Sequence, residues 1–194
     1  MADIEDFPTV AAWIRSRGCN DDSSLRLLAA HLTPVSFPKK HLLVSEGNFA
    51  GHAFFIERGM TRSYWVVAGE EVTTSFSTEG SIVFSMDEVY YGRRSEEYVE
   101  TVEPVKAFTI PIGALRRAVE SDLSLARWWT AIHQDEYRRL HRSHKERLTL
   151  PAAERYRAFA EIYPDVCRRG RLSDIASYLG ITPSTLSRIR ALKN

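Results

Sequence analysis

Cysteines are scarce in this sequence, and long apolar runs are missing. Its two cysteines, Cys19 and Cys167, lie far apart, and neither belongs to a Cys-x-x-Cys pair. We therefore expect no disulfide scaffold, structural zinc or iron–sulfur cluster held by this chain alone. No run of about 18 apolar residues occurs, and the opening MADIEDFPTVAAW carries three acids. These absences argue against a signal peptide or a membrane span, and they predict a cytoplasmic protein.

Enzyme motifs and metal-binding patterns are missing as well. The sequence contains no P-loop, Gly-x-Ser-x-Gly, His-Glu-x-x-His or EF-hand pattern. His133, His141 and His144 share one predicted helix, and His141 and His144, three residues apart, could touch one metal. No acidic or cysteine partner stands at helical spacing on the face of that pair, and Arg138, Arg139, Arg142 and Lys145 surround it. A solvated basic helix end explains these histidines better than a metal site. We expect a protein that is not an enzyme and has neither a metal nor an evident cofactor.

Charge is divided unevenly along the 194 residues. Residues 1–149 contain 18 Lys and Arg against 21 Asp and Glu, whereas residues 150–194 contain 8 against 4. A basic, arginine-rich end suits a polyanion such as DNA, because each neutralised phosphate releases counterions. A solvated arginine face is the alternative, and charge alone favours that alternative.

Glycines punctuate the region from Val35 to Ile110 at regular intervals. They fall at positions 47, 59, 69, 80 and 92, between short runs rich in β-branched and aromatic residues such as AFFIERG and TRSYWVVAG. Turns at this spacing predict antiparallel strands in a small roll or barrel rather than strand–helix–strand units. Two short helices are predicted before the strands, at residues 9–17 and 22–32.

A long helix is predicted after the strands. Asp122 can cap a helix over residues 123–148, which would be roughly 39 Å long. An apolar stripe, interrupted by Glu136, follows this helix at steps of three and four residues. The length and the stripe favour pairing with a second copy in a homodimer, whereas packing along its own domain is the alternative. The predicted dimer contacts are Leu125, Trp129, Ile132 and Leu140.

The segment SDIASYLGITPSTLSRIR, residues 173–190, has the residue types that a helix-turn-helix requires. Gly180 can end the first helix in the left-handed conformation. Thr182 can cap the second helix, and Pro183 suits its first position because the missing N–H costs nothing there. Apolar residues before and after this elbow recur at helical spacing and can bury the two helices against each other. An ordinary helical hairpin in an α domain is the alternative.

The predicted DNA contacts fall into two sets. Arg188 is the one exposed residue of the second helix able to read guanine through two hydrogen bonds, and the hydroxyl residues near it suit phosphate or water-mediated contacts. Arginines flanking the first helix suit backbone phosphates, although solvated arginines are an equal alternative. The predicted set is Arg168, Arg169, Arg171, Thr182, Ser184, Thr185, Ser187 and Arg188.

The roll containing FFIERGMTRSYW, the long helix and the ending IASYLGITPSTLSRIR resemble, in this order, the cyclic-AMP receptor protein and FNR (CRP/FNR) family of bacterial transcription regulators. The resemblance is greatest to the variety common in Bacteroidetes. It implies an α+β fold: an N-terminal antiparallel β-roll with flanking helices, similar to cyclic-nucleotide-binding domains (1–120), a long dimerisation helix (121–149) and a C-terminal all-α helix-turn-helix domain (150–194). It implies a homodimeric regulator of transcription that binds double-stranded DNA, with RNA polymerase as a further candidate partner. A ligand-binding or protein-interaction module with a vestigial helix-turn-helix is the alternative.

The resemblance also locates a ligand pocket, in which this sequence departs from cyclic-nucleotide binders. Those proteins carry a Gly-Glu pair for the ribose and an Arg-Ser pair for the cyclic phosphate. Here Phe84 and Ser85 replace the first pair, and Ser95 and Glu96 replace the second, with Arg94 one position away. Acidic residues around this segment would repel a phosphate. We therefore expect weak or no cyclic-AMP binding, and either another small-molecule effector or a roll that only supports the dimer. The pocket candidates are Phe84, Ser85, Met86, Arg94, Ser95 and Tyr98.

Overall fold

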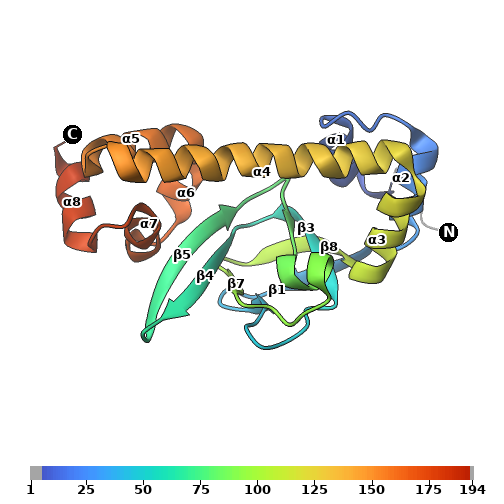
Figure 1. Ribbon diagram of the computed structural model, residues 1–194, viewed down its shortest axis with the longest axis horizontal. Coiled ribbons are helices and arrows are strands. Elements are labelled where there is room, and N and C mark those ends of the chain that lie inside the picture. Colours follow the sequence, from blue (N-terminus) through green and yellow to red (C-terminus); the bar gives the residue numbers. More distant parts are fainter. Residues whose placement is uncertain (1–5, 193–194) are drawn as a thin grey trace.

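The computed structural model describes residues 6–192 and places a β-roll beside one long helix (Figure 1). Residues 1–5 of the predicted roll domain (1–120) and residues 193–194 of the predicted helix-turn-helix domain (150–194) lie outside the described residues. Helices α1 (Pro8–Arg15) and α2 (Asp22–Ala29) lie near one end of the long helix. Asp21 caps α2, because its carboxylate accepts a hydrogen bond from the Ser24 amide at 3.1 Å.

The roll consists of two antiparallel sheets of four strands each. Pairs such as β3–β8 join strands that are far apart in the sequence, so the chain closes on itself as a roll and not as a simple meander. The predicted antiparallel roll is therefore confirmed. In spatial order the first sheet contains β1 (Thr33–Phe37), β8 (Val105–Pro111), β3 (His52–Arg58) and β6 (Ile82–Val83), and the second contains β2 (Leu42–Val44), β7 (Tyr98–Thr101), β4 (Thr61–Val67) and β5 (Glu70–Ser77).

One predicted turn glycine is required by a close backbone approach. Gly59, between β3 and β4, has a φ of 109°, and a Cβ there would lie 2.5 Å from the Pro104 carbonyl oxygen. Only glycine avoids both the strained conformation and this clash. Between β6 and β7 the chain forms a π-helical turn, η2 (Asp87–Tyr91), which the strand pattern did not predict.

Helices make up most of the remaining described residues, 112–192. Asp122 separates α3 (Ile112–Ser121) from α4 (Leu123–Thr149) and caps α4 by accepting a hydrogen bond from the Leu125 amide at 2.8 Å. The predicted long helix is thus confirmed to within a residue. Four short helices follow at its far end: α5 (Ala152–Ile162), α6 (Pro164–Arg169), α7 (Leu172–Leu179) and α8 (Pro183–Ala191).

The first half of α4 belongs to the core of the roll. Trp128 is fully buried there, edge-to-face with Trp13 at 5.7 Å between ring centroids and stacked on Phe55 at 6.3 Å. Leu125 is also fully buried in this core, so the predicted dimer contact at Leu125 is wrong: its side chain faces its own domain. Trp129, like Ile132, is partly buried against the same core.

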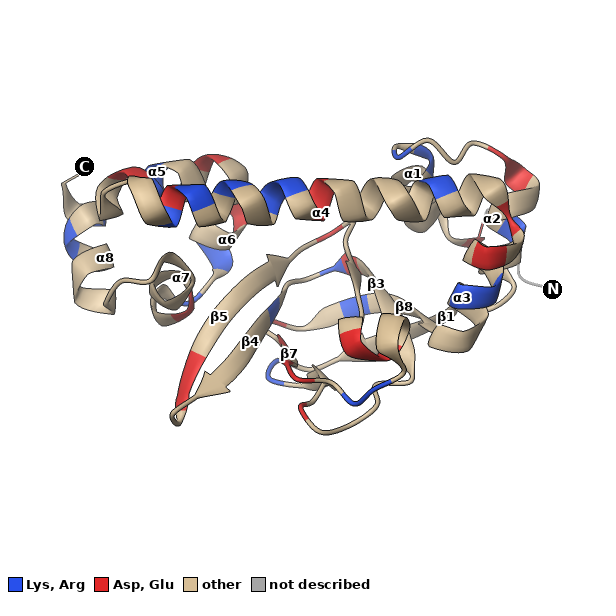
Figure 2. Ribbon diagram, in the orientation of Figure 1, with Lys and Arg blue, Asp and Glu red and all other residues tan. Residues whose placement is uncertain are grey.

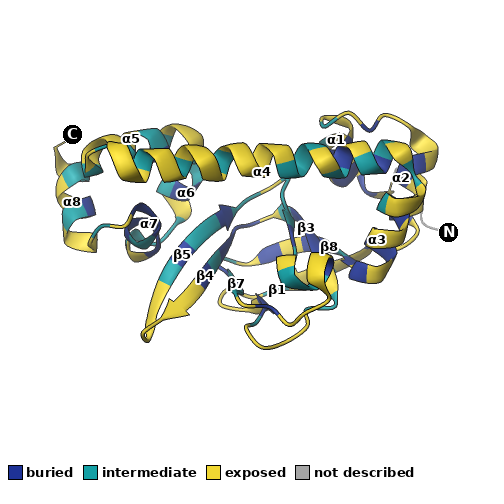
Figure 3. Ribbon diagram, in the orientation of Figure 1, coloured by how far each residue is buried: buried dark blue, intermediate teal, exposed yellow. Residues whose placement is uncertain are grey.

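The middle of α4 has a different environment. Residues 134–138 are all exposed, and Figure 3 shows the middle of α4 largely as exposed surface. Leu140, the remaining predicted dimer contact, is 50% exposed, and Tyr137 beside it is 69% exposed. Apolar side chains in solvent on a bare helix suit a protein partner.

A second core joins the roll to the C-terminal helices. Met60, Phe76 and Val102 come from the roll, and they share this core with residues of α5, α6, α7 and α8. The ring of Phe76 lies 6.1 Å from that of Phe159 and 5.8 Å from that of Tyr178. The helical group is therefore packed onto the sheet that contains β4 and β5.

Replacing Trp128 with alanine should lower the free energy of unfolding by about 3–5 kcal/mol, because it leaves a cavity among aromatic rings. Trp65→Ala is the matched control, since Trp65 is 50% exposed near the tip of the β4–β5 hairpin, and it should cost less than about 1 kcal/mol. Urea unfolding followed by circular dichroism measures both. Equal losses would contradict the assignment of Trp128 to the core.

Candidate nucleic-acid interface

Helices α7 and α8 form the predicted helix-turn-helix. Gly180 ends α7 in the left-handed conformation, with φ 66° and ψ 41°. The Ile181 amide donates to the Ala176 carbonyl at 3.0 Å, as is common where a helix ends at such a glycine. The Thr182 hydroxyl accepts from the Thr185 amide at 3.2 Å and so caps α8, with Pro183 in its first turn. The local predictions for the elbow are confirmed.

Buried side chains hold the two helices together. Ile175 and Ala176 of α7 and Leu186 of α8 are fully buried, and Leu179 is nearly so. Ala176 and Leu186 belong to the same buried cluster. The buried faces of both helices are thus defined, which leaves the opposite face of α8 for other contacts.

The outer face of α8 carries hydroxyls and one arginine. Thr182, Ser184, Ser187 and Arg188 are exposed, whereas Thr185 is half-buried. Arg188 makes one long contact, 3.5 Å, to the Thr185 hydroxyl. Its guanidinium is therefore available for the two-hydrogen-bond geometry by which arginine reads guanine.

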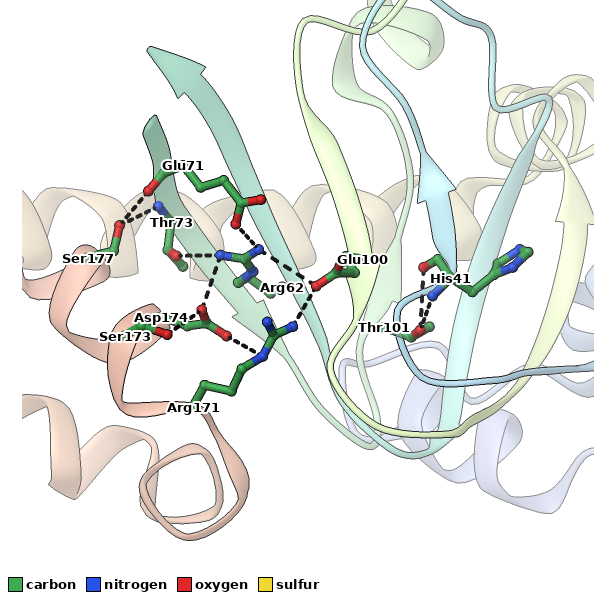
Figure 4. Close-up of polar contacts among 10 residues, drawn as sticks. All are labelled: His41, Arg62, Glu71, Thr73, Glu100, Thr101, Arg171, Ser173, Asp174 and Ser177. Atoms are coloured by element: carbon green, nitrogen blue, oxygen red, sulfur yellow. Dashed lines mark hydrogen bonds and ion pairs between the residues drawn. The ribbon is translucent and has the colours of Figure 1, made fainter. Parts of the chain in front are cut away.

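The arginines predicted to bind phosphate are placed differently from one another. Arg168 is exposed and pairs only locally, with Asp165. Arg169 and Arg171 instead point at acidic side chains of the roll (Figure 4 shows Arg171). Both Nη atoms of Arg169 bind Glu79, at 2.8 and 2.9 Å, and Nη1 also lies 3.0 Å from Glu103.

Arg171 completes a second contact of this kind. Its Nη2 donates to Glu100 at 2.7 Å, and its Nε lies 3.3 Å from Asp174, an ion pair whose geometry falls short of a hydrogen bond. Glu100 belongs to β7, and its side chain is only 14% exposed. Two of the three predicted phosphate-binding arginines are therefore already paired with acidic side chains of the roll.

The residue at the centre of this contact was not predicted from the sequence. Arg62 of β4 is 2% exposed, and its guanidinium binds Glu71, lies 3.3 Å from Asp174 and lies 3.6 Å from Glu100 (Figure 4). It also lies over the ring of Tyr64 at 4.3 Å. The signal in the sequence was an arginine inside the otherwise uncharged strand TRSYWVV. An arginine buried in such a strand requires anionic partners, so it indicates a buried ion pair.

The hydroxyl of Ser177 joins α7 to the edge of the sheet. It donates to the Glu71 carbonyl at 3.0 Å and accepts from the Thr73 amide at 2.9 Å. Strand β5 is an edge strand, so these backbone groups have no neighbouring strand on that side. One serine side chain therefore takes the place of a strand partner.

The ion pair between the roll and Arg169 persists over a wide pH range. The Arg169 guanidinium holds the pKa of Glu79 down at about 2, and the Gly59 amide adds to the lowering. Because the pKa is depressed in the paired state, the pair contributes at pH values above the ordinary 4.5 and is lost as pH falls towards 2. The contact is therefore fully charged at neutral pH.

Charge along α4 changes near its middle. Figure 2 shows lysines and arginines gathered on the half of α4 that adjoins α5 and α6. Arg139 of this half donates to Glu136 and, at 3.2 Å, to the Tyr178 hydroxyl of α7. The basic half of α4 thus supports the helix-turn-helix, and it extends the positive surface beyond residues 150–194.

Two of the predicted ligand residues are structural. Ser85 is fully buried, and its hydroxyl accepts from the Glu88 amide at 3.3 Å. Ser95 is 2% exposed, and its hydroxyl donates to the Glu97 carbonyl at 3.0 Å and accepts from the Glu97 amide at 3.2 Å. Both hydroxyls stabilise the backbone, which corrects the expectation that they face a ligand.

The other four ligand candidates lie in separate surroundings. Phe84 packs on Trp129 at 5.2 Å between ring centroids, Tyr98 stacks on Tyr64 at 5.1 Å, and Met86 is 47% exposed. Two cavities of the structure, one between α4 and helices α5 and α7 and one between α1 and β3, are lined by none of the six predicted residues.

Two charged side chains in and beside η2 bind the backbone of the β2–β3 loop. The Glu88 carboxylate accepts from the amides of Ala50, at 2.7 Å, and Gly51, at 3.0 Å. Arg94 donates to the Gly47 carbonyl at 2.8 Å. An acidic and a basic side chain of the predicted effector region are thus both engaged with the β2–β3 loop.

Glu97 lies between η2 and α4 in acidic surroundings. Burial raises the pKa of Glu97 to about 7, and the carboxylates of Asp87 and Glu136 add to the rise. The folded chain therefore keeps this carboxyl protonated at pH values below about 7.

No group of three His, Cys, Asp or Glu that could hold a metal ion occurs within residues 6–192. In the same part of the chain, no helix is both long and apolar enough to cross a bilayer.

Glu97→Gln should make the protein more stable at high pH. Between pH 4.5, the ordinary pKa, and about 7, the folded chain binds more protons at this group than the unfolded chain, so stability falls as pH rises. The substitution should raise the free energy of unfolding at pH 8 by on the order of 1–3 kcal/mol, and by less at pH 5. Urea unfolding at both pH values measures this, with Glu96→Gln as the exposed neighbouring control. A gain that does not depend on pH would contradict the raised pKa.

Comparison with known proteins adds evidence on the fold. No family model and no curated protein matches the sequence. Among solved structures, FixK2 from Bradyrhizobium japonicum is 22% identical over 83% of each chain, with a TM-score of 0.69. CLP from Xanthomonas campestris, described as a c-di-GMP responsive global regulator, is 16% identical over 89% of this chain and 92% of its own, with a TM-score of 0.66. A protein from Eubacterium rectale assigned to the CRP/FNR family of transcriptional regulators is 13% identical over 89% of this chain and 83% of its own, with a TM-score of 0.68. The β-roll, the long helix and the helix-turn-helix of this chain therefore have the fold of the CRP/FNR transcription regulators.

Proposed function

We propose that this chain is a sequence-specific DNA-binding transcription regulator that acts as a homodimer. The observation that carries the proposal is the outer face of α8, which combines an intact N-cap, exposed hydroxyls and the available guanidinium of Arg188. A helix presented in this way by a second, packed helix suits the major groove. The fold shared with transcription regulators supports the same conclusion.

Arg188 is the residue assigned to base recognition. The hydroxyls of Thr182, Ser184 and Ser187 surround it, and they suit phosphate or water-mediated contacts. Arg168, on the exposed side of α6, suits the DNA backbone. Selectivity for sequence therefore rests mainly on one side chain, which makes it easy to test.

The homodimer is assigned to the middle of α4. Tyr137 and Leu140 expose apolar surface on a part of the helix that neither the roll nor the C-terminal helices cover. Two such helices side by side would bury these residues and would place two helix-turn-helix units at the same end of the dimer. DNA half-sites one helical turn apart fit that arrangement.

Cyclic AMP is not the effector that the roll supports. The carboxylate of Glu88 and the guanidinium of Arg94 bind the β2–β3 loop. Ser85 and Ser95 are buried, and acidic side chains surround Glu97. An anionic phosphate would meet repulsion there. The roll either binds a different small molecule or acts as a scaffold for the dimer. The response to c-di-GMP is a property described for CLP.

Arg188→Ala should abolish sequence preference while leaving the fold intact. Selection from a random duplex library should give the wild type a site with two-fold symmetry, and Arg188→Ala should bind that site about 5–150-fold more weakly. Arg157→Ala removes the same charge from an exposed position of α5 and should bind almost normally. If low-salt selection enriches no sequence for the wild type, the chain is instead a ligand-binding or protein-interaction module.

Leu140→Asp should dissociate the homodimer, because a charge would enter an apolar contact. Arg138→Asp changes the charge by more but lies two residues away, about 200° around the helix, and should leave the dimer intact. Sedimentation velocity over a range of concentrations distinguishes dimer from monomer. A wild-type protein that remains monomeric throughout that range would refute the assigned interface.

A further inference from the structure

The surface of the helix-turn-helix that DNA would require is partly occupied by the roll. When a helix-turn-helix binds DNA, its first helix crosses the sugar–phosphate backbone while the second enters the major groove. Here the first helix, α7, lies against β5, and its Asp174 pairs with Arg62 of β4 (Figure 4). Asp174 of α7 is 4% exposed, and the Ser177 hydroxyl binds the backbone of β5 at Glu71 and Thr73.

The acidic side chains of the roll bind the arginines much as phosphates would. Glu79 accepts from both Nη atoms of Arg169, the two-pronged geometry that arginine also uses for phosphate oxygens. Glu103 approaches the same guanidinium, at 3.0 Å. Glu100 accepts from Arg171 at 2.7 Å. The donors of these two arginines cannot serve carboxylates and phosphates at once.

The occupied and the free surfaces lie on different helices. Arg188 and the hydroxyls of α8 stay in solvent, whereas Arg169 and Arg171 beside α7 are paired with the roll. Base recognition is therefore available while part of the backbone recognition is covered. Phosphate contacts supply much of the affinity of DNA-binding proteins, so covering them weakens binding without removing the reading face.

We propose that the roll holds the helix-turn-helix in a closed state, in which Glu79, Glu100 and Glu103 compete with DNA phosphates for Arg169 and Arg171. The inference rests on the proposed DNA binding. Release of α7 from the sheet frees two arginines and increases affinity. The ion pairs that hold Arg169 are partly exposed, with the Glu79 side chain at 37% and Arg169 at 30%, which makes them weak enough for DNA to displace.

Neutralising the three carboxylates tests the competition. The variant Glu79→Gln/Glu100→Gln/Glu103→Gln is compared with Glu70→Gln/Glu96→Gln/Glu120→Gln, which changes the charge equally at three exposed positions that contact no arginine of α6 or α7. Both are measured as full chains by fluorescence anisotropy, at fixed salt, with the duplex that the wild type selects. The first variant should bind about tenfold more tightly than the wild type, and the control should change affinity by no more than about twofold.

Hydrogen exchange at the Thr73 amide reports docking without DNA, because that amide donates to the Ser177 hydroxyl. The neutralised variant should exchange this amide faster than the control does while keeping the protection of β3 and β8, which shows that the roll remains folded. Faster exchange with unchanged DNA affinity would overturn the proposal. An equal rise in affinity for the control variant would also overturn it, because net charge alone would then explain the effect.

A closed variant tests the converse. Thr73→Cys with Ser177→Cys, in a chain carrying Cys167→Ser, places one thiol on β5 and one on α7, at the point where the Ser177 hydroxyl accepts a 2.9 Å hydrogen bond from the Thr73 backbone amide. The disulfide-bonded protein should bind the duplex about tenfold more weakly than the same protein after reduction. Equal affinity before and after reduction would show that the docked arrangement binds DNA. That result would refute the closed state but not the proposed DNA binding. If neither the wild type nor any variant binds a DNA duplex, the proposed function itself is refuted.

Discussion

The arrangement of the molecule depends on one buried cation, the guanidinium of Arg62. A charge that is 2% exposed costs several kcal/mol unless anionic groups surround it. Its partners come from three segments that are far apart in the chain: Glu71 of β5, Glu100 of β7 and Asp174 of α7. Because the roll alone does not supply all of them, the buried arginine has its three acidic partners only when α7 is docked on the sheet.

The long helix α4 connects the two ends of this arrangement and has three environments along its length. Trp128 anchors its first half in the core of the roll, and Arg139 of its second half donates to Tyr178 of α7. The stretch between them is the most exposed. The middle of α4 therefore lies between two cores and exposes the apolar side chains of Tyr137 and Leu140. The aromatic contacts of Phe76 with Phe159 and Tyr178 then fix the side of α4 on which the C-terminal helices lie.

Local features of the chain were predictable, and distant pairings were not. The caps at Asp122 and Thr182 and the left-handed Gly180 follow from neighbouring residues, so the long helix and the elbow were predicted almost to the residue. Leu125 was assigned to a dimer because its spacing fits a stripe, but spacing shows only that a residue lies on a face, not what covers that face. Ser85 and Ser95 were placed by resemblance. The hydroxyl bonds they make are local, but Ser95 is also held by backbone hydrogen bonds to Gly47 and Asn48 of the β2–β3 loop, which no local pattern encodes.

By itself, the sequence determined the order of elements, the antiparallel roll, the capped long helix and the outward face of α8. These features depend on periodicity, caps and turns, which act over a few residues. Only the tertiary structure decided that Arg169 and Arg171 bind the roll and that Arg62 is buried against α7. The reason is physical. The energy of an ion pair depends on the distance between two charges, and for residues about a hundred positions apart only the folded structure fixes that distance.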